Sequence, residues 1–301
     1  MSNGQIATPQ QNAPAPSVEL DAMLSKKAAD AMQLGPPCIE KDNSVHRAIS
    51  IIIEEQISSL PVVENGQLVG IISDKDLLMF LFGQEFLYAT VKDFMTANNV
   101  VTFDVADNLS SVCNCLATNS FRRVPILLEG RPIGIISRAD LIRFATKNLY
   151  SPTDAATGEP LKKESLLAAD VMRGGRVQTV RTETPMPEIA QILAKKRVSA
   201  LPVVDDCMNL LGIVSEKDVL ASLFAPNSTV LMARDLMTTD VVSFNIHDDL
   251  LDICDKLVRE EFRRVPILDQ GKLVGIISRT DIMQHIVHNK SYGAIYNAQK
   301  L

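Results

Sequence analysis

The chain has 301 residues, 46% of them hydrophobic and 22% charged, and a formal net charge of −6. This composition is typical of a globular protein of about two domains. The acidic balance argues against a nucleic-acid partner, because such proteins usually carry an excess of Lys and Arg. No stretch reaches the roughly 18 consecutive apolar residues of a membrane span. The five cysteines are scattered and include no Cys-x-x-Cys pair, which argues against a disulfide framework and favours a cytoplasmic location.

Residues 1–20 are rich in Gln, Ala, Pro and Asn and are predicted to form a disordered tail. Beyond them, one phrase recurs four times: a glycine, two apolar residues, a serine and, three residues after the serine, an aspartate. The serine and aspartate pairs are Ser73 and Asp76, Ser137 and Asp140, Ser215 and Asp218, and Ser278 and Asp281. The first and third copies are 142 residues apart and the second and fourth are 141 apart, which indicates duplication of a two-repeat unit.

Each copy predicts the same order of elements, which is clearest in the fourth. Apolar alternation and helical periodicity predict a strand at Val241–Phe244 followed by a helix at Asp248–Glu260. A hairpin is then predicted from a strand at Arg264–Leu268, a glycine-containing turn at Asp269–Lys272 and a strand at Leu273–Ile277. A second helix is predicted from Ser278. The strand at Leu273–Ile277 is apolar throughout and is expected to be buried. A unit of roughly 60 residues buries little surface alone, so we expect the repeats to pair and share their sheets.

The repeat pattern also predicts the domain organisation. We expect repeat 1 at residues 28–88, repeat 2 at 89–149, a linker at 150–166, repeat 3 at 167–226, repeat 4 at 230–289 and a C-terminal tail at 290–301. The glycine of each phrase permits close approach of backbone, either to a ligand or to a packing neighbour.

The element order, an apolar-Pro strand and the Gly-apolar-x-Ser-x-x-Asp phrase together resemble the cystathionine β-synthase (CBS) domain. The resemblance covers residues 28–287. It implies a mixed fold of the α+β or α/β class, with four β-α-β-β-α repeats that pair into two Bateman modules and close into one disc-like assembly. It further implies clefts between repeats that bind adenine nucleotides or related molecules. The chain is also similar to the regulatory gamma subunits of AMP-activated protein kinase in two respects. It has four repeats with little else, and its segment Arg197–Val204 resembles a segment of those subunits.

The Ser-x-x-Asp pairs have two compatible interpretations. Serine followed three residues later by an acid is close to a helix capping box, with Asp in place of Glu or Gln. The same groups also suit a nucleotide cradle, because a helix N-terminus offers free N–H groups to phosphate and an aspartate can accept from ribose hydroxyls.

Further candidate positions follow from the resemblance. A hydroxyl residue of the first strand, expected to contact base or phosphate, is present as Thr102, Thr179 and Ser243, whereas repeat 1 has Cys38 there. The apolar-Pro pairs, expected to border the base, are Val124 and Pro125, Leu201 and Pro202, and Val265 and Pro266. The alternative for these pairs is the hydrophobic core, where most of the side chains are expected.

Two adjacent arginines precede the proline strand in repeats 2 and 4 only: Arg122 and Arg123, and Arg263 and Arg264. Arginine suits phosphate because its fork donates two parallel hydrogen bonds, and the alternative is a solvated or ion-paired side chain. Since side chains alternate along a strand, one of each adjacent pair is expected to face the cleft. In a disc the four would converge unpaired and repel one another. The resemblance aligns Arg123 and Arg264 with a phosphate-contacting arginine of the gamma subunits, whose neighbouring histidine is replaced by Arg122 and Arg263.

No nucleophile elbow, P-loop or histidine paired with a nucleophilic cysteine is present. We therefore predict a protein that is not an enzyme, with no catalytic cofactor and no metal. The expected role is a sensor that binds AMP, ADP or ATP and signals to an effector protein of unknown identity. A ligand-free scaffold and a nucleic-acid-binding CBS protein are the alternatives. The alternative to closure within one chain is that the halves lie apart and discs form only by homodimerisation of separate chains.

Overall fold

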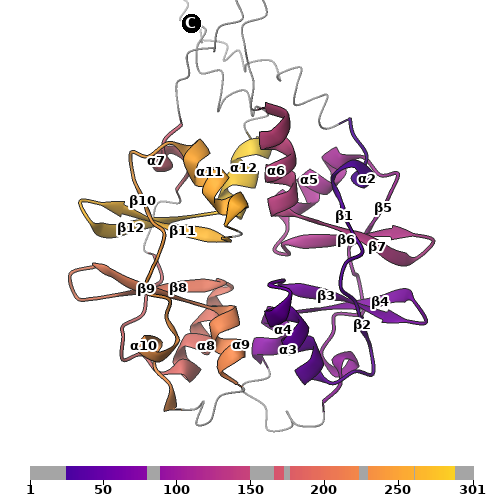
Figure 1. The fold of residues 1–301 in the computed structure, drawn as a ribbon, viewed down its shortest axis with the longest axis horizontal. Coiled ribbons are helices and arrows are strands. Elements are labelled where there is room, and N and C mark those ends of the chain that lie inside the picture. The colour runs from indigo at the N-terminus through magenta and orange to yellow at the C-terminus, as the bar shows by residue number, and fades with distance from the viewer. Residues whose placement is uncertain are drawn as a thin grey trace, which may run out of the picture.

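The computed structural model describes residues 25–79, 89–149, 166–172, 177–223, 230–260 and 262–288. The predicted tails at 1–20 and 290–301, and the predicted linker apart from Leu166, lie outside these residues. Four similar units of sheet and helix form a closed ring within one chain (Figure 1). Within the described residues, no helix combines the length and the apolar character needed to cross a membrane.

The first two repeats share one order of elements, a short strand, a helix, a hairpin and a second helix, as predicted. In repeat 1 the elements are α2 (Ala28–Ala31), β1 (Gln33–Leu34), β2 (Ile39–Glu40), α3 (Val45–Glu54), β3 (Ser59–Glu64), β4 (Gln67–Ser73) and α4 (Asp74–Met79). In repeat 2 they are the 3-10 helix η3 (Val91–Asp93), β5 (Phe103–Asp104), α5 (Leu109–Thr118), β6 (Arg123–Leu128), β7 (Arg131–Ser137) and α6 (Arg138–Leu149).

The second half follows the same order. Repeat 3 contains α7 (Ala168–Val171), α8 (Met186–Lys196), β8 (Ala200–Val204), β9 (Leu210–Ser215) and α9 (Glu216–Ser222). Repeat 4 contains α10 (Ala233–Leu236), β10 (Phe244–Asn245), α11 (Leu250–Arg259), β11 (Arg264–Asp269), β12 (Lys272–Ser278) and α12 (Arg279–His288). In repeat 3 the first strand is reduced to a single parallel bridge between Val180 and Val203.

Repeat 4 differs from its prediction in two details. Its first strand, β10, begins at Phe244 rather than Val241, because only Phe244 and Asn245 pair with β11. Strand β12 is not buried throughout: Val274 and Ile276 are half-buried, while the alternate residues Leu273 and Ile277 lie in the core. One face of the hairpin packs on the helices, and the other borders a cleft described below.

The repeats of each half exchange their leading segments. Residues 27–34 of repeat 1 pack on repeat 2, where β1 pairs with β7, and residues 90–96 of repeat 2 return to repeat 1. The second half repeats the exchange, through the bridges Leu167 to Asp249 and Ile213 to Thr238. Each sequence repeat is therefore not a self-contained unit.

The glycine of the recurring phrase is the packing site for this exchange. A Cβ atom on Gly70 would lie 2.7 Å from Sδ of Met95, in the segment that arrives from repeat 2. Gly212 and Gly275 face Met237 and Met172 in the same way. The glycines therefore serve packing between repeats.

Two hydrophobic cores hold the ring together, and each joins the two halves of the chain. One core combines helices and strands of repeats 1 and 3, with Leu60 and Leu201 among its fully buried members. The other combines repeats 2 and 4, with Ile126 and Ile267. Figure 1 shows the helices α3, α4, α8 and α9 gathered at one pole of the ring and α5, α6, α11 and α12 at the other. The sheets of repeats 1 and 2 face each other, as do those of repeats 3 and 4, so closure of both halves into one disc is confirmed.

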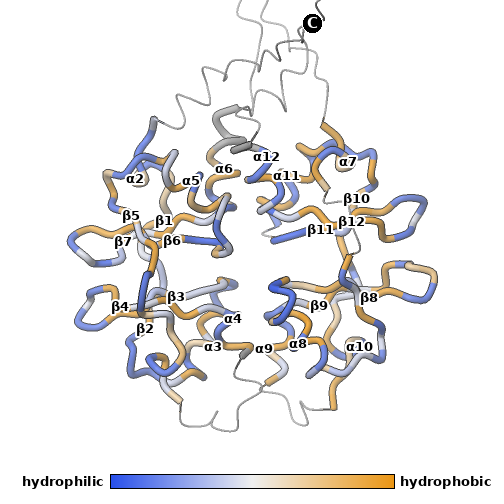
Figure 2. The backbone as a smooth tube through the Cα atoms, turned by 180° about the vertical axis from the view of Figure 1, so that it is seen from behind, coloured by the Kyte–Doolittle hydropathy of each residue, from blue (hydrophilic) through white to orange (hydrophobic). Residues whose placement is uncertain are grey.

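Polar residues line the middle of this ring. Figure 2 shows hydrophilic backbone at the inner ends of β6 and β11 and hydrophobic backbone further outward along the same strands. These inner ends carry the arginine pairs at Arg122 and Arg263.

Candidate functional site

Among the residues that the structure describes, three clefts between repeats each contain one Ser-x-x-Asp pair. The Ser73 cleft, between repeats 1 and 2, has a volume of about 280 Å³. The Ser215 cleft, between repeats 3 and 4, is its counterpart in the second half and measures about 300 Å³. The Ser278 cleft measures about 410 Å³ and is bordered by repeats 3 and 4 together with Lys75 and Arg138 of the first half. These volumes lie at the lower end of the range of small-molecule sites.

All four Ser-x-x-Asp pairs form the predicted capping box. In each, the serine backbone N–H and hydroxyl donate to Oδ2 of the aspartate, and the aspartate N–H donates back to the serine Oγ. At Ser215 the three distances are 2.6, 2.6 and 3.4 Å. The cap fixes the aspartate side chain at the helix start, so its second oxygen has a defined position.

That second oxygen differs between the pairs. For Asp76 and Asp218, Oδ1 receives no hydrogen bond from the part of the chain that the structure describes. For Asp140, Oδ1 accepts from Nε2 of Gln33 at 2.6 Å and from Nη1 of Arg143 at 3.0 Å. Gln33 lies in β1, the strand exchanged from repeat 1. Asp140 therefore has both oxygens occupied by the protein itself, which sequence spacing alone did not indicate.

The predicted hydroxyl residues do not line the clefts. The lining is formed instead by the residues just before them, Val100 and Val101, Val177 and Gln178, and Val241 and Val242, so Thr102, Thr179 and Ser243 stand one position further along the chain. Of the apolar-Pro pairs, Val124, Leu201 and Val265 are fully or almost fully buried core residues. Pro125, Pro202 and Pro266 are all buried, and Pro266 also lines the Ser215 cleft.

Both arginines of each adjacent pair border a cleft, contrary to the prediction from strand alternation. Arg122 and Arg123 line the Ser73 cleft, and Arg263 and Arg264 line the Ser215 cleft. Strands β6 and β11 begin at Arg123 and Arg264. The preceding residue in each pair lies outside the strand, so its side chain does not follow the alternation. All four also border a central cavity of about 60 Å³.

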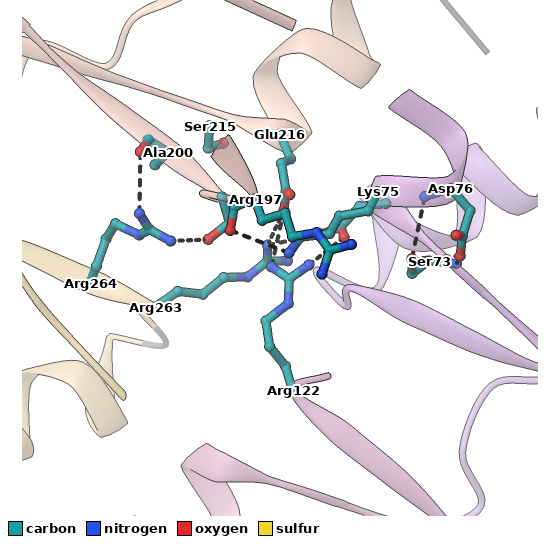
Figure 3. A network of polar contacts seen from close by, with 12 residues as sticks. Ser73, Lys75, Asp76, Arg122, Arg197, Ala200, Ser215, Glu216, Arg263 and Arg264 are labelled. Carbon is teal, nitrogen blue, oxygen red and sulfur yellow. Dashed lines mark hydrogen bonds and ion pairs between the residues drawn. The ribbon is translucent and has the colours of Figure 1, made fainter. Parts of the chain in front are cut away.

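The expectation of four unpaired arginines is wrong for two of them. Arg122 donates to Oδ1 of Asp74 at 2.5 Å and to Oε2 of Glu216 at 3.0 Å. Arg263 donates to Oδ2 of Asp74 at 2.9 Å and to Oε2 of Glu216 at 3.3 Å. Both carboxylate side chains are completely buried. Figure 3 shows Arg122 and Arg263 converging from opposite repeats on Glu216 at the start of α9. We call these four residues the central ion network.

Sequence reasoning missed Asp74 and Glu216, although a signal for them exists. The residue after the serine is an acid in repeats 1 and 3 and an arginine, Arg138 or Arg279, in repeats 2 and 4. This alternation matches the arginine pairs, which are confined to repeats 2 and 4.

Arg123 and Arg264 have a different environment. Arg264 donates to Oγ of Ser199 at 2.5 Å and to the backbone oxygen of Ala200 at 3.2 Å, and no carboxylate among the described residues pairs with it. Nε of Arg123 is buried without a hydrogen-bond partner. Burial, together with the charges of Arg122 and Arg263, lowers the pKa of Arg123 to about 10. Burial is also the main cause that lowers the pKa of Arg264 to about 10. The positive charges of Arg123 and Arg264 are therefore not balanced by an ion pair with a carboxylate of the described residues.

No cluster of three or more His, Cys, Asp or Glu able to hold a metal ion is present among the described residues. The polar groups of the clefts are instead hydroxyls, carboxylates and arginines.

The CBS domain family matches residues 28–83, 91–147, 168–225 and 233–288. The chain belongs to the CBS domain family. These four matches cover most of the chain, in the two tandem pairs that the sequence spacing predicted.

Similar proteins are known from their sequences and from crystal structures. The chain is 25% identical over 200 residues to protein MJ1225 of Methanocaldococcus jannaschii, which covers 66% of this chain and 70% of that protein. It is 31% identical over 201 residues to the AMP-activated protein kinase subunit gamma-3 of Homo sapiens, covering 62% of this chain and 39% of the subunit. The chain therefore matches less than half of the length of that subunit.

Two crystal structures share the fold. That of MJ1225 has a TM-score of 0.76 at 19% identity and covers 87% of this chain and 100% of that one. That of a conserved Pyrococcus horikoshii protein has a TM-score of 0.56 at 24% identity, with the same coverage. At these identities the likeness concerns the arrangement of the four repeats.

Proposed function

We propose that this CBS protein is a non-catalytic regulatory subunit that binds adenine nucleotides in its clefts and reports the bound state to an effector protein. The observation that carries the proposal is the composition of the Ser73 and Ser215 clefts. Each combines a capped aspartate whose Oδ1 receives no hydrogen bond among the described residues, an apolar wall and arginines from the neighbouring repeat.

Each of these groups suits one part of a nucleotide. Oδ1 of Asp76 or Asp218 can accept from a ribose hydroxyl. The valine pairs Val100 and Val101, or Val241 and Val242, offer an apolar surface to a base. The arginines at the inner end of each cleft suit phosphate. The central cavity, at about 60 Å³, is too small for a nucleotide but adjoins all three clefts through shared arginines.

The relatives support the same class of ligand. One is a subunit of a kinase whose name records its activation by AMP. Signalling to an effector is proposed by analogy with that subunit, and the identity of the effector is left open.

Equilibrium dialysis and thermal unfolding with adenosine, AMP, ADP, ATP, S-adenosylmethionine and NAD test the proposal. A nucleotide that binds the folded protein alone, at a hundredfold excess over Kd, stabilises it by about 2.7 kcal/mol. We expect saturable binding that is weakened by Asp76→Asn and Asp218→Asn and unchanged by Asp252→Asn, an exposed acid on α11. No binding of any of these compounds at millimolar concentration would refute the proposal and favour a ligand-free scaffold.

A further inference from the structure

A pair of buried carboxylates lies where all four repeats meet. Asp74 begins α4 in repeat 1 and Glu216 begins α9 in repeat 3, and neither side chain is exposed to solvent. Arg122 of repeat 2 and Arg263 of repeat 4 each bind both carboxylates, at distances of 2.5 to 3.3 Å. Every arginine in this network therefore connects the two halves of the chain.

The hydrogen bonds of the network leave one oxygen without a donor. The four ion pairs use Oδ1 and Oδ2 of Asp74 and only Oε2 of Glu216. Oε1 of Glu216 is buried and receives no hydrogen bond from the described residues. A buried charged oxygen without a donor is costly. A proton on Oε1 would remove that cost, because the protonated group could donate to the neighbouring Asp74.

We propose that Asp74 and Glu216 share one proton, and that this proton sets how much positive charge Arg122 and Arg263 offer to an anion in the clefts. The effect on the clefts rests on the proposed nucleotide-binding function. The shared proton itself does not, because it follows from the ligand-free network.

The charges around the pair favour this arrangement. Burial, followed by the negative charge of Asp74, raises the pKa of Glu216 to about 7 against the pull of both paired arginines. Burial opposes ionisation of Asp74 as well, but the charges of Arg122 and Arg263 lower its pKa. Glu216 is therefore the member of the pair that takes up the proton, while the lowered pKa of Asp74 favours its ionised form.

The other charged groups that interact with the pair are basic apart from Asp76, whose pKa is raised mainly by burial and to a smaller extent by the charge of Asp74. Lys75 follows Asp74 on α4 and interacts electrostatically with both carboxylates. Arg123 on β6 interacts with Asp74, and Arg264 on β11 interacts with Glu216. Among the four arginines and two carboxylates, the excess of positive charge is two when both acids are ionised and three when the pair holds its proton. An anion in the neighbouring clefts should therefore bind more tightly to the protonated form.

The first test needs no nucleotide. The pKa of Glu216 in the folded protein lies above its ordinary value of 4.5, so its contribution to stability is complete below pH 4.5 and is lost as the pH rises through about 7. We expect the Tm of the unmutated protein to fall between pH 6 and 8 by roughly 4 °C relative to that of Glu216→Gln, whose amide mimics the protonated acid. Glu188→Gln, an exposed acid of the same repeat, serves as the matched control and should keep the pH profile of the unmutated protein.

The second test uses AMP and adenosine at pH 6.5 and 8. We expect AMP to bind about tenfold more tightly to the unmutated protein at pH 6.5, and adenosine equally at both values. Titration of the phosphate itself, with a pKa of about 6, acts in the opposite direction. In Glu216→Gln the affinity for AMP should stay at the level of the protonated protein at both pH values.

The outcomes separate the two proposals. If Glu216→Gln follows the unmutated protein in both tests, the shared proton is refuted even though nucleotides bind. If no nucleotide binds but the Tm difference is present, the nucleotide function is refuted and the shared proton is supported.

Infrared difference spectroscopy of the unmutated protein gives an independent readout should Glu216→Gln fail to fold. The C=O stretching band of a buried protonated carboxylic acid should be present at pH 6 and lost at pH 8. Its absence at both values would overturn the proposal.

Discussion

Nη1 of Arg263 lies 2.9 Å from Oδ2 of Asp74, although the two residues are 189 positions apart in the chain. This ion pair joins the last repeat to the first, and Arg122 to Glu216 joins the second to the third. Both pairs connect the two halves of the chain, so the halves are held together by side chains as well as by the covalent connection.

Removing one member of the central ion network should destabilise the protein strongly. Asp74→Ala leaves Arg122 and Arg263 without one of their two buried partners, and loss of one partner of a buried pair typically costs about 3–5 kcal/mol. Denaturant unfolding measures the change. Asp255→Ala removes the partner of Arg259, an exposed pair in which the arginine is 73% exposed, and should cost less than about 1 kcal/mol. Equal effects of the two substitutions would contradict a structural role for the network.

Replacing glycines of the recurring phrase by alanine should destabilise the protein to different degrees, depending on which atoms the new methyl group contacts. In Gly212→Ala the new Cβ would lie 2.9 Å from the backbone oxygen of Thr238 as well as 2.7 Å from Sδ of Met237, and overpacking of this kind costs about 1–3 kcal/mol. In Gly275→Ala its close neighbour is Sδ of Met172, a flexible side chain at 2.7 Å. We expect a clearly larger loss of stability for Gly212→Ala in thermal unfolding. The reverse order would show that the contact with the backbone oxygen of Thr238 does not decide the cost at Gly212.

Substituting the capped aspartates one at a time should show which of them contributes to nucleotide affinity and which contributes only to the stability of the fold. Asp218→Asn keeps the shape of the cap but loses an acceptor for ribose, and a hydrogen bond between charged and neutral groups is worth about 1.5–3 kcal/mol, or roughly ten- to a hundredfold in Kd. Asp140→Asn should leave nucleotide affinity unchanged and lower stability instead, because its carboxylate already binds Gln33 and Arg143. Calorimetric titration with AMP distinguishes them. Equal loss of affinity in both variants would mean that Gln33 is displaced when ligand binds.

Arg123 and Arg264, which pair with no carboxylate among the described residues, should make the affinity depend on the number of phosphates in the ligand. The double variant Arg123→Gln with Arg264→Gln removes buried positive charge beside the clefts, so the differences in affinity among AMP, ADP and ATP should shrink, together with the salt dependence of binding. The affinity for adenosine should be kept. Arg259→Gln, an exposed arginine on α11, is the control for net charge. A double variant that still ranks the nucleotides as the unmutated protein does would exclude these arginines from phosphate binding.

Much of this architecture is predictable because it repeats locally. The element order follows from periodicity and from the turn at Gln270 and Gly271, both of which have positive φ, as two-residue hairpin turns require. The capping boxes also follow from spacing alone. Both depend on residues at most a few positions apart.

The features that sequence reasoning missed depend on distant residues. Nothing near Asp140 in the sequence indicates that Gln33 occupies it, because β1 reaches β7 only through the exchange of segments. A second recurring phrase, an acid followed two residues later by methionine, gives Met32, Met95, Met172 and Met237. It would have predicted partners for the glycines. Asp74 and Arg263 pair only because the ring closes in three dimensions. The spacing of the repeats in the sequence does not predict which residues meet when it closes.

The sharing of each core between the halves has a consequence for biosynthesis. When the first half has left the ribosome, its helices α3, α4 and α5 still lack the apolar surfaces of repeats 3 and 4 against which they pack. At about 5–20 residues per second, the missing 142 residues take on the order of ten seconds to arrive. During that interval the nascent half exposes two incomplete cores, and it can pair with the same half of a neighbouring nascent chain on the polysome. Closure of the ring therefore needs both halves of the chain and does not proceed repeat by repeat.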